Sequence, residues 1–254
     1  MILDKFRLDG KVALVTGTSS GLGQAIAIAL GEAGADVACH CRSKGGAAET
    51  VAAITGLGRR AIEVLGDLAE KDTPARTVDA VIGEFGQVDI LVNNAGMIRR
   101  SPAVDYSEDD WSAVIEVNLS SVFRLSQAAG RKMVEQRSGK IVNIASLLSF
   151  QGGITVPAYT ASKSAVAGLT KALANEWAKF NVNVNAIAPG YMATKNTQPL
   201  RDDETRNRQI MERIPAGRWG NSDDLAGAAV FLSSAASDYM QGHILVVDGG
   251  WMAR

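Results

Sequence analysis

One short stretch near the start of the chain decides the fold: Val12-Ala13-Leu14-Val15-Thr16-Gly17-Thr18-Ser19-Ser20-Gly21-Leu22-Gly23. An apolar, β-like run leads into a glycine-rich turn, and helical spacing follows. The first glycine permits a tight turn, the second lets the backbone approach a pyrophosphate, and the third lets the helix pack close to the strand. A helix N-terminus also presents unpaired N–H groups to an anion. The stretch predicts a cradle for the phosphates of a dinucleotide; the alternative is a glycine-rich turn without a ligand.

The rest of the chain alternates short apolar runs with helical stretches. We expect strands over residues 12–16, 36–41, 61–65, 88–92, 140–145, 182–187 and 244–247. We expect helices over 21–33, 46–55, 73–85, 107–136 (broken near 116–118), 158–180, 201–213 and 222–233. Alternating strands and helices indicate βαβ units and a parallel sheet, and strands apolar on both faces require helices on each side. The pattern predicts a single doubly wound α/β domain over residues 1–254.

Composition narrows the class of protein. The chain has 254 residues, 46% of them hydrophobic, and 26 basic against 27 acidic side chains, for a formal charge of −1. This balance argues against a nucleic-acid or membrane partner, since both favour a basic face. The first ten residues lack the apolar core of a signal peptide, so we expect a cytoplasmic protein. Cys39 and Cys41 are expected to be buried free thiols, and no metal site is expected because Cys and His are so few.

A candidate acid–base group lies in the second half of the chain. Tyr159 and Lys163 stand four residues apart, on one face of a predicted helix. Tyrosine ordinarily titrates near pH 10, and a nearby ammonium group lowers that pKa. Ser146 follows a predicted strand, where ligands bind in open α/β sheets, and its hydroxyl can hold a substrate oxygen. The alternatives are a Tyr and a Lys that merely decorate a helix, and a serine that opens a turn.

These motifs together resemble the short-chain dehydrogenase/reductase family. The family carries T-G-x3-G-x-G where this chain has Thr16 to Gly23, followed by a catalytic Asn, Ser, Tyr and Lys that Asn118, Ser146, Tyr159 and Lys163 match in order. The resemblance implies a Rossmann-type fold with a seven-stranded sheet, and hydride transfer between a nicotinamide cofactor and a CH–OH group. It also implies that Asn118 anchors a proton-relay water, Ser146 polarises the carbonyl, Tyr159 is the acid/base, and Lys163 lowers its pKa and holds the nicotinamide ribose.

The resemblance extends the cofactor site along the chain. It places Asn94, Ala95 and Gly96 by the adenosine ribose, Asp67 at the adenine, and the Pro189-Gly190 turn under the nicotinamide. The complete predicted set is Gly17, Ser19, Ser20, Gly21, Leu22, Gly23, Arg42, Asp67, Leu68, Asn94, Ala95, Gly96, Tyr159, Lys163, Pro189, Gly190 and Thr194.

The choice between NAD and NADP depends on the end of the second strand. An acid there binds the ribose 2′-OH of NAD, whereas a basic residue accommodates the NADP phosphate. This strand ends at Cys41 without an acid, and Arg42 and Ser43 follow. These residues favour NADP, while the resemblance favours NAD, with Arg42 then only stacking on adenine.

Longer stretches resemble a group within the family that acts on sugar acids from uronate and pectin breakdown. They include Met97–Arg100, Ser149–Gly153 and Asp248–Arg254. A six-carbon sugar acid needs a cation for its carboxylate, and an arginine fork binds a carboxylate bidentately. Our hypothesis is that Arg99 and Arg100 serve this role and that Gln151 and Tyr191 meet hydroxyl groups. The alternative places either arginine in a solvated loop or a subunit contact.

We make two further predictions for the C-terminal quarter of the chain. The polar segment 197–213 is predicted to be a mobile lid that closes over substrate. Family members are usually tetramers, and we expect Trp251 and Met252 to be buried at a subunit contact of a homotetramer. Two other functions remain open: a reductase of 3-oxoacyl chains or other carbonyls, and a non-catalytic NAD(P)-binding protein.

Overall fold

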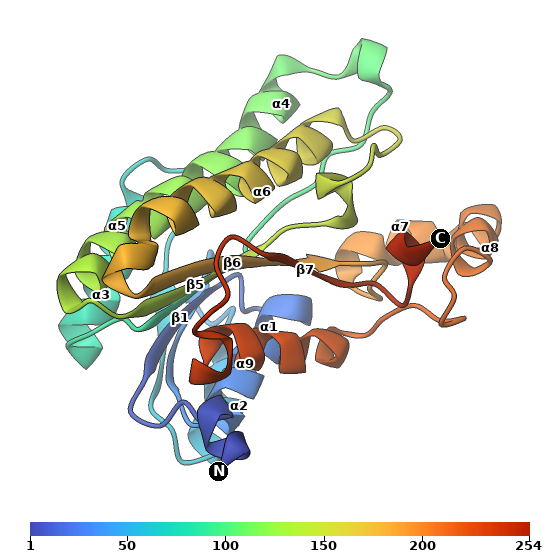
Figure 1. The fold of residues 1–254 in the computed structure, drawn as a ribbon. Helices are drawn as coiled ribbons and strands as arrows, with labels where there is room; N and C mark the ends of the chain where they lie inside the picture. Colours follow the sequence, from blue (N-terminus) through green and yellow to red (C-terminus); the bar gives the residue numbers. More distant parts are fainter.

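The apolar runs of the sequence form a parallel sheet at the centre of the molecule (Figure 1). The computed structural model describes all residues from 1 to 254. Seven strands lie in the order β3-β2-β1-β4-β5-β6-β7, every neighbouring pair parallel. Their bounds are β1 Val12–Thr16, β2 Asp36–Cys41, β3 Ala61–Leu65, β4 Ile90–Asn93, β5 Gly139–Ile144, β6 Val182–Pro189 and β7 Ile244–Val247. The predicted strand number is confirmed, and each strand falls within two residues of its expected bounds.

Helices cover both faces of this sheet. Their bounds are α1 Gly21–Glu32, α2 Ala48–Gly56, α3 Thr73–Phe85, α4 Glu108–Ile115, α5 Ser121–Gln136, α6 Pro157–Trp177, α7 Gln198–Asp202, α8 Glu204–Met211 and α9 Ala226–Ser233. Helices α1, α2 and α9 lie on one face, and α3, α5 and α6 on the other (Figure 1). One buried apolar cluster fills each interface: Ile26 and Leu30 of α1 belong to the first, and Leu125 and Met133 of α5 to the second.

Two predicted helices differ from the structure in informative ways. The expected break near residues 116–118 is a π-turn over Glu116–Ser120, which joins α4 to α5 without ending the helix. The expected helix over 201–213 is wrong as a single element, because α7 ends at Asp202 and α8 begins at Glu204. Asp203 stands between them in extended backbone, and its carboxylate accepts a hydrogen bond from the Arg206 N–H. An aspartate in this position caps a new helix instead of continuing the old one.

The strand order creates a crevice at the carboxyl edge of the sheet. The chain runs outward from β1 through β2 to β3, then crosses to β4 on the other side of β1. The loops after β1 and β4 therefore diverge, and such a switch point is where ligands bind in doubly wound folds.

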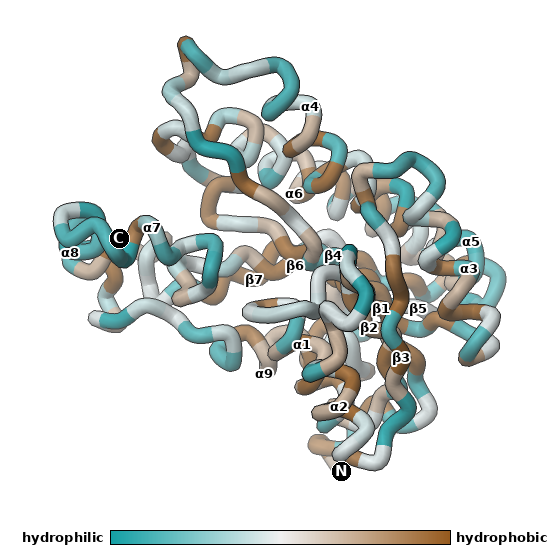
Figure 2. The backbone as a smooth tube through the Cα atoms, turned by 180° about the vertical axis from the view of Figure 1, so that it is seen from behind, coloured by the Kyte–Doolittle hydropathy of each residue, from teal (hydrophilic) through white to brown (hydrophobic).

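The segment between β6 and α9 leaves the sheet. Figure 1 shows α7 and α8 beyond the ends of β6 and β7, with the C-terminus beside them. Figure 2 shows that α8 is mostly hydrophilic, in contrast to the apolar strands. Trp251 is 4% exposed within this one chain, packed with Leu147, Ile210 and Ile214. The expectation that Trp251 is buried at a subunit contact is therefore wrong, since residues of its own chain cover it. Met252 is 37% exposed, and its burial against another subunit stays a prediction.

Two further observations concern the cysteines and the length of the helices. Cys39 and Cys41 are free and buried, as predicted. No helix is long and apolar enough to cross a bilayer.

Candidate active site

A cavity of about 1270 Å³ opens at the carboxyl edge of the sheet. It extends from the glycine-rich turn after β1 to Trp251 near the C-terminus. Its wall includes every predicted cofactor residue, together with Ser146, Arg100, Gln151 and Tyr191. Residues far apart in the sequence thus meet around one space large enough for a dinucleotide and a small substrate.

The glycine-rich turn has the backbone that its sequence predicts. Gly17 and Gly21 have φ of +71° and +62°, values that favour glycine. A Cβ on Gly23 would lie 2.2 Å from the Gly17 carbonyl oxygen, so α1 approaches β1 as closely as backbones allow. Ser20 precedes α1 without capping it through its side chain. The first N–H groups of α1 are therefore available to an anion, and this cradle fits the pyrophosphate of a dinucleotide.

Asn94 fixes this turn in place. Its side-chain amide donates to the carbonyl oxygens of Thr16, at 2.8 Å, and Gly17, at 3.1 Å. The Thr16 hydroxyl in turn accepts from the backbone N–H groups of Asn94 and Ala95, both at 3.0 Å. The loop after β4 and the turn after β1 are thus held as one unit, so the predicted cofactor residues on the two loops have a shared geometry.

The far end of the cavity is formed by β2 and the loop after β3. Arg42 is exposed on the cavity wall, near Asp67 and Leu68. Ser43 does not reach this wall; its carbonyl oxygen accepts from Gly46 N–H at 2.9 Å. His40 also lines the cavity but carried no signal in the sequence. Its Nε2 lies 3.0 Å from the Gly66 oxygen, and burial lowers its pKa.

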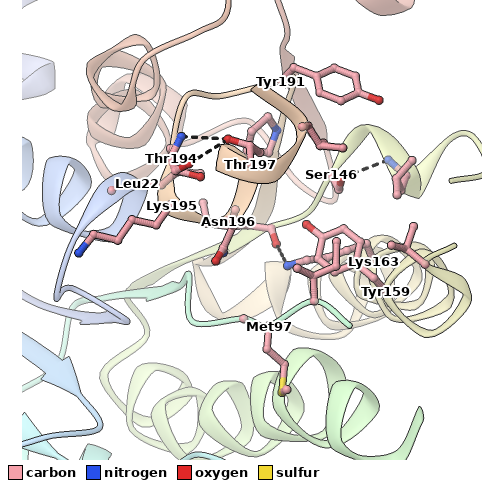
Figure 3. A pocket seen from close by; sticks show the side chains of 18 of the residues that line it. Leu22, Met97, Ser146, Tyr159, Lys163, Tyr191, Thr194, Lys195, Asn196 and Thr197 are labelled. Atoms are coloured by element: carbon pink, nitrogen blue, oxygen red, sulfur yellow. Dashed lines mark hydrogen bonds between the residues drawn. The ribbon is translucent and has the colours of Figure 1, made fainter. Parts of the chain in front are cut away.

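Ser146, Tyr159 and Lys163 come together on one wall (Figure 3). Lys163 is 4% exposed, and its Nζ donates to the Ile144 carbonyl oxygen at 2.6 Å. The Nζ stands 5.7 Å from the centre of the Tyr159 ring. The end of β5 thus aims the lysine along α6 toward the tyrosine, as the predicted i, i+4 relationship requires.

Burial shifts the pKa values of Lys163 and Tyr159 in opposite directions. Burial lowers the pKa of Lys163 to about 8, because the charged ammonium loses its hydration. Burial also raises the pKa of Tyr159, while a hydrogen bond with Ser146 and the positive charge of Arg100 act in the other direction. The lowering of the Tyr159 pKa by Lys163 stays a prediction; Ser146 and Arg100 are the groups that lower it in this structure.

Asn118 lies behind this wall, in the π-turn. It is fully buried, and its Oδ1 accepts from the Met97 N–H at 2.8 Å. Its amide donates to the Met97 oxygen at 2.9 Å and to the Ser162 hydroxyl at 3.3 Å. π-turns inside α-helices occur frequently at functional sites. Here the turn places Asn118 between the loop after β4 and helix α6, and its predicted contact with a relay water stays a prediction.

A family model described as short chain dehydrogenase matches residues 11–205, which include the turn and the tyrosine–lysine pair. The chain belongs to the short-chain dehydrogenase family. It is accordingly an NAD(P)-dependent oxidoreductase that acts on CH–OH groups, as the resemblance implies.

This short-chain dehydrogenase has relatives that match it from end to end. It is 55% identical over 255 residues to a 2-dehydro-3-deoxy-D-gluconate 5-dehydrogenase from Dickeya dadantii, with both chains fully covered. A solved structure from Agrobacterium tumefaciens with bound NADP is 56% identical, with a TM-score of 0.92 over 98% of this chain and 99% of that one. A gluconate 5-dehydrogenase from Burkholderia cenocepacia, in complex with NADP and tartrate, is 41% identical, with a TM-score of 0.96 over all of both chains.

Three of the four residues predicted to bind substrate line the cavity, and one does not. Arg100 lines the cavity of the dehydrogenase and donates to the Asn196 carbonyl oxygen at 3.1 Å. Gln151 and Tyr191 also line this cavity. Arg99 is not brought to this wall; it is exposed and pairs with Asp110 at 3.3 Å. Successive residues in an extended loop face opposite sides, so only one of the two adjacent arginines reaches the site.

The segment between β6 and α9 supplies cations that the motifs alone did not single out, and its closing as a lid stays a prediction. Beyond Arg100, Arg42 and Lys163, the cavity is lined by Lys195, Arg201, Arg206 and Arg213, and its only acidic residue is Asp67. The three arginines belong to the highly charged segment 197–213, which we predicted to be a mobile lid without assigning a role to any one of its cations; Lys195 lies just before it. The structure turns several of these side chains toward the cavity and gives it a cationic wall.

Proposed function

We propose that this dehydrogenase transfers hydride between NADP and a six-carbon sugar acid, with 2-dehydro-3-deoxy-D-gluconate as the substrate. The observation that carries the proposal is one cavity lined by Ser146, Tyr159 and Lys163 and also by arginines that form no ion pair, namely Arg100, Arg206 and Arg213. Such a wall favours an anionic substrate of small size. The name of the Dickeya relative, which matches over its whole length, supports the same substrate.

The reaction follows from the residues on that wall. A nicotinamide cofactor held in this cavity would supply the hydride acceptor for oxidation and the hydride donor for reduction. In oxidation, the Tyr159 phenolate takes the hydroxyl proton of the substrate as the C–H bond breaks, while Ser146 donates a hydrogen bond to the same oxygen. Lys163 would hold the nicotinamide ribose, and Asn118 would anchor a water through which the proton leaves. In reduction each of these steps runs in reverse.

The preference for NADP rests on the adenosine end of the cavity. Arg42 is exposed to the cavity, and no acid stands at the end of β2 to meet a ribose 2′-OH. A guanidinium group without an acidic partner suits a 2′-phosphate, because its fork matches the oxygens of the anion. The structures from Agrobacterium and Burkholderia contain NADP, which supports the same choice.

We propose further that the enzyme is a cytoplasmic homotetramer. Trp111 of α4 and Phe123 of α5 are 39% and 43% exposed on one outer layer of helices (Figure 1). Large apolar side chains on adjacent helices favour burial against another copy of the chain. Light scattering on the purified protein tests this: a tetrameric mass supports it, and a monomeric mass refutes it.

Initial rates with parallel substrates test the proposed activity. The purified enzyme is offered 2-dehydro-3-deoxy-D-gluconate with NADP⁺ and with NAD⁺, and a 3-oxoacyl thioester with the two reduced cofactors. We expect turnover of the sugar acid, faster with NADP⁺. Turnover of the thioester alone would identify a 3-oxoacyl reductase, which calls for an apolar slot and not for this cationic wall. Tight cofactor binding without turnover would indicate a non-catalytic binding protein.

A further inference from the structure

Arg213 stands out among the cations of the lid. It follows α8, at the point where the chain turns back toward the sheet, and it lines the cavity. Its guanidinium carbon lies 4.0 Å from the centre of the Trp251 ring. The side chain makes no ion pair, whereas Arg208 of α8 pairs with Glu212, and Arg218, further along the chain, pairs with Asp224. A stacked arginine with its donors unused is held flat and ready to bind an anion.

The surface beneath Arg213 is rigid. The Trp251 ring packs against Tyr191, with centroids 4.6 Å apart, and Tyr191 packs edge-on against Trp219 at 5.5 Å. The Trp251 Nε1–H donates to Gln151 Oε1 at 3.3 Å, and the Trp219 Nε1–H donates to Asn207 at 2.8 Å. Both indoles are therefore fixed at their polar ends as well as packed, so Arg213 rests on a surface that does not need to reorganise.

This surface adjoins the wall of the cavity that carries Ser146, Tyr159 and Lys163. Leu147, the residue after Ser146, is buried in the same cluster as Trp251 and Ile214. Gln151 and Tyr191, which both contact Trp251, line the cavity together with Ser146. Arg206 also lines the cavity, and the positive charges of Arg206 and Arg213 both act on Tyr191, whose pKa burial raises. A short molecule whose hydroxyl carbon meets Ser146 and Tyr159 thus has a cationic group within the same cavity for its other end.

We propose that Arg213, stacked on Trp251, binds the carboxylate of the substrate and makes the enzyme specific for acids. The inference rests on the proposed function and deepens it, because it names the group that selects a sugar acid over a neutral sugar. It also reassigns the carboxylate role from Arg99, which is paired with Asp110 outside the cavity. Arg100 keeps its place beside Tyr159, where its charge acts on the reacting proton.

Two substrates and three variants distinguish binding of the carboxylate by Arg213 from a purely structural role of this residue. The variants are Arg213→Gln, Arg213→Lys and, as a matched control on the same lid, Arg208→Gln, which removes an exposed arginine outside the cavity. Each is assayed with the sugar acid and with its neutral amide, in the presence of saturating NADP⁺. We expect Arg213→Gln to raise KM for the acid by about tenfold to a hundredfold, the range of a charge-assisted hydrogen bond, with little change for the amide. Arg213→Lys, which keeps the charge but loses the fork, should fall between, and Arg208→Gln should match the wild type.

A binding measurement keeps the test independent of turnover. Calorimetric titration of D-gluconate into the NADP-bound wild type and Arg213→Gln enzymes should show the same loss in affinity, with NADP binding unchanged. An unaltered preference for acid over amide, or equal gluconate affinity in both proteins, would overturn the role of Arg213. Absence of wild-type turnover of the sugar acid would instead refute the proposed substrate, and the gluconate titration would still decide whether Arg213 binds a carboxylate.

Discussion

The Nζ of Lys163 donates a hydrogen bond to the carbonyl oxygen of Ile144 at 2.6 Å, at the point where β5 ends and the cavity begins. The ammonium group is buried, with one neutral acceptor and no carboxylate in contact. Such a group is costly in the absence of cofactor, because burial penalises its charge. This wall of the cavity therefore holds a residue whose burial costs stability, and the proposed mechanism gives that residue a role in the reaction.

The stability of the cofactor-free protein should reveal this cost. The pKa of Lys163 falls from its ordinary 10.5 to about 8 on folding, so between these values the unfolded chain binds more protons and stability rises with pH. Replacing Lys163 with Met removes the penalty. We expect the free energy of unfolding to increase by about 3 kcal/mol at pH 7 but only by about 1 kcal/mol at pH 9.5. Urea unfolding at both pH values checks this, with exposed Lys171→Met as control; an equal effect at both pH values would contradict it.

The pH dependence of alcohol oxidation should depend on Arg100. In the proposed mechanism oxidation needs the Tyr159 phenolate, so its rate should rise with pH through the pKa of that group. The charge of Arg100 and the hydrogen bond of Ser146 both lower this pKa against the effect of burial. Arg100→Gln should therefore move the rising limb of the kcat/KM profile to higher pH. The adjacent Arg99→Gln is the control, since Arg99 pairs with Asp110 away from the cavity, and a shift of equal size in both variants would refute the assignment.

Arg42 should set the cofactor preference. Arg42→Ala removes the exposed guanidinium at the adenosine end of the cavity. We expect the Kd for NADP to rise by about tenfold to a hundredfold, while the Kd for NAD changes little. Fluorescence titration of the two reduced cofactors measures both constants. Lys44→Ala, two residues further on and outside the cavity wall, serves as control. Equal weakening of NAD and NADP would mean that Arg42 only stacks on adenine.

Substitution of glycine by alanine should have opposite effects on stability at Gly23 and at Gly168. A Cβ on Gly23 would lie 2.2 Å from the Gly17 oxygen and 2.3 Å from the Asn94 amide nitrogen, whereas a Cβ on Gly168 in α6 meets nothing within 4 Å. Gly23→Ala should destabilise the protein by about 1–3 kcal/mol and abolish cofactor binding. Gly168→Ala should stabilise it by about 0.5–1 kcal/mol, since alanine favours a helix. Thermal unfolding and cofactor titration check both, and a well-bound cofactor in Gly23→Ala would refute the close packing of the cradle.

The sheet and the cradle could be predicted because their causes are local. Val12 to Gly23 contains its own strand, turn and helix start, and each glycine has a backbone conformation or a close contact that explains it. The spacing of Tyr159 and Lys163 is likewise a property of one helix. The end of β5 then places Ser146 beside them through the regular register of a parallel sheet.

The fold and the contacts of segment 197–213 could not be predicted in the same way. Its helices are short and polar, and the break at Asp203 depends on a single cap that competes with continuing the helix. Contacts between Arg213, Trp251 and Gln151 join three separate segments, and no pattern within any one of them indicates the others. The same holds for Arg99 and Arg100, since only the path of the loop decides which of two adjacent arginines enters the cavity.

Transfer of an isotopic label tests the central claim most directly. The enzyme is given 2-dehydro-3-deoxy-D-gluconate carrying deuterium at C5, together with NADP⁺, and the reduced cofactor is analysed by mass spectrometry. We predict that deuterium appears on the nicotinamide, and that Tyr159→Phe binds NADP but transfers none. No reduction of the cofactor by the wild type, or reduction without transfer of the label, would contradict hydride transfer from the C5 hydroxyl carbon of this sugar acid.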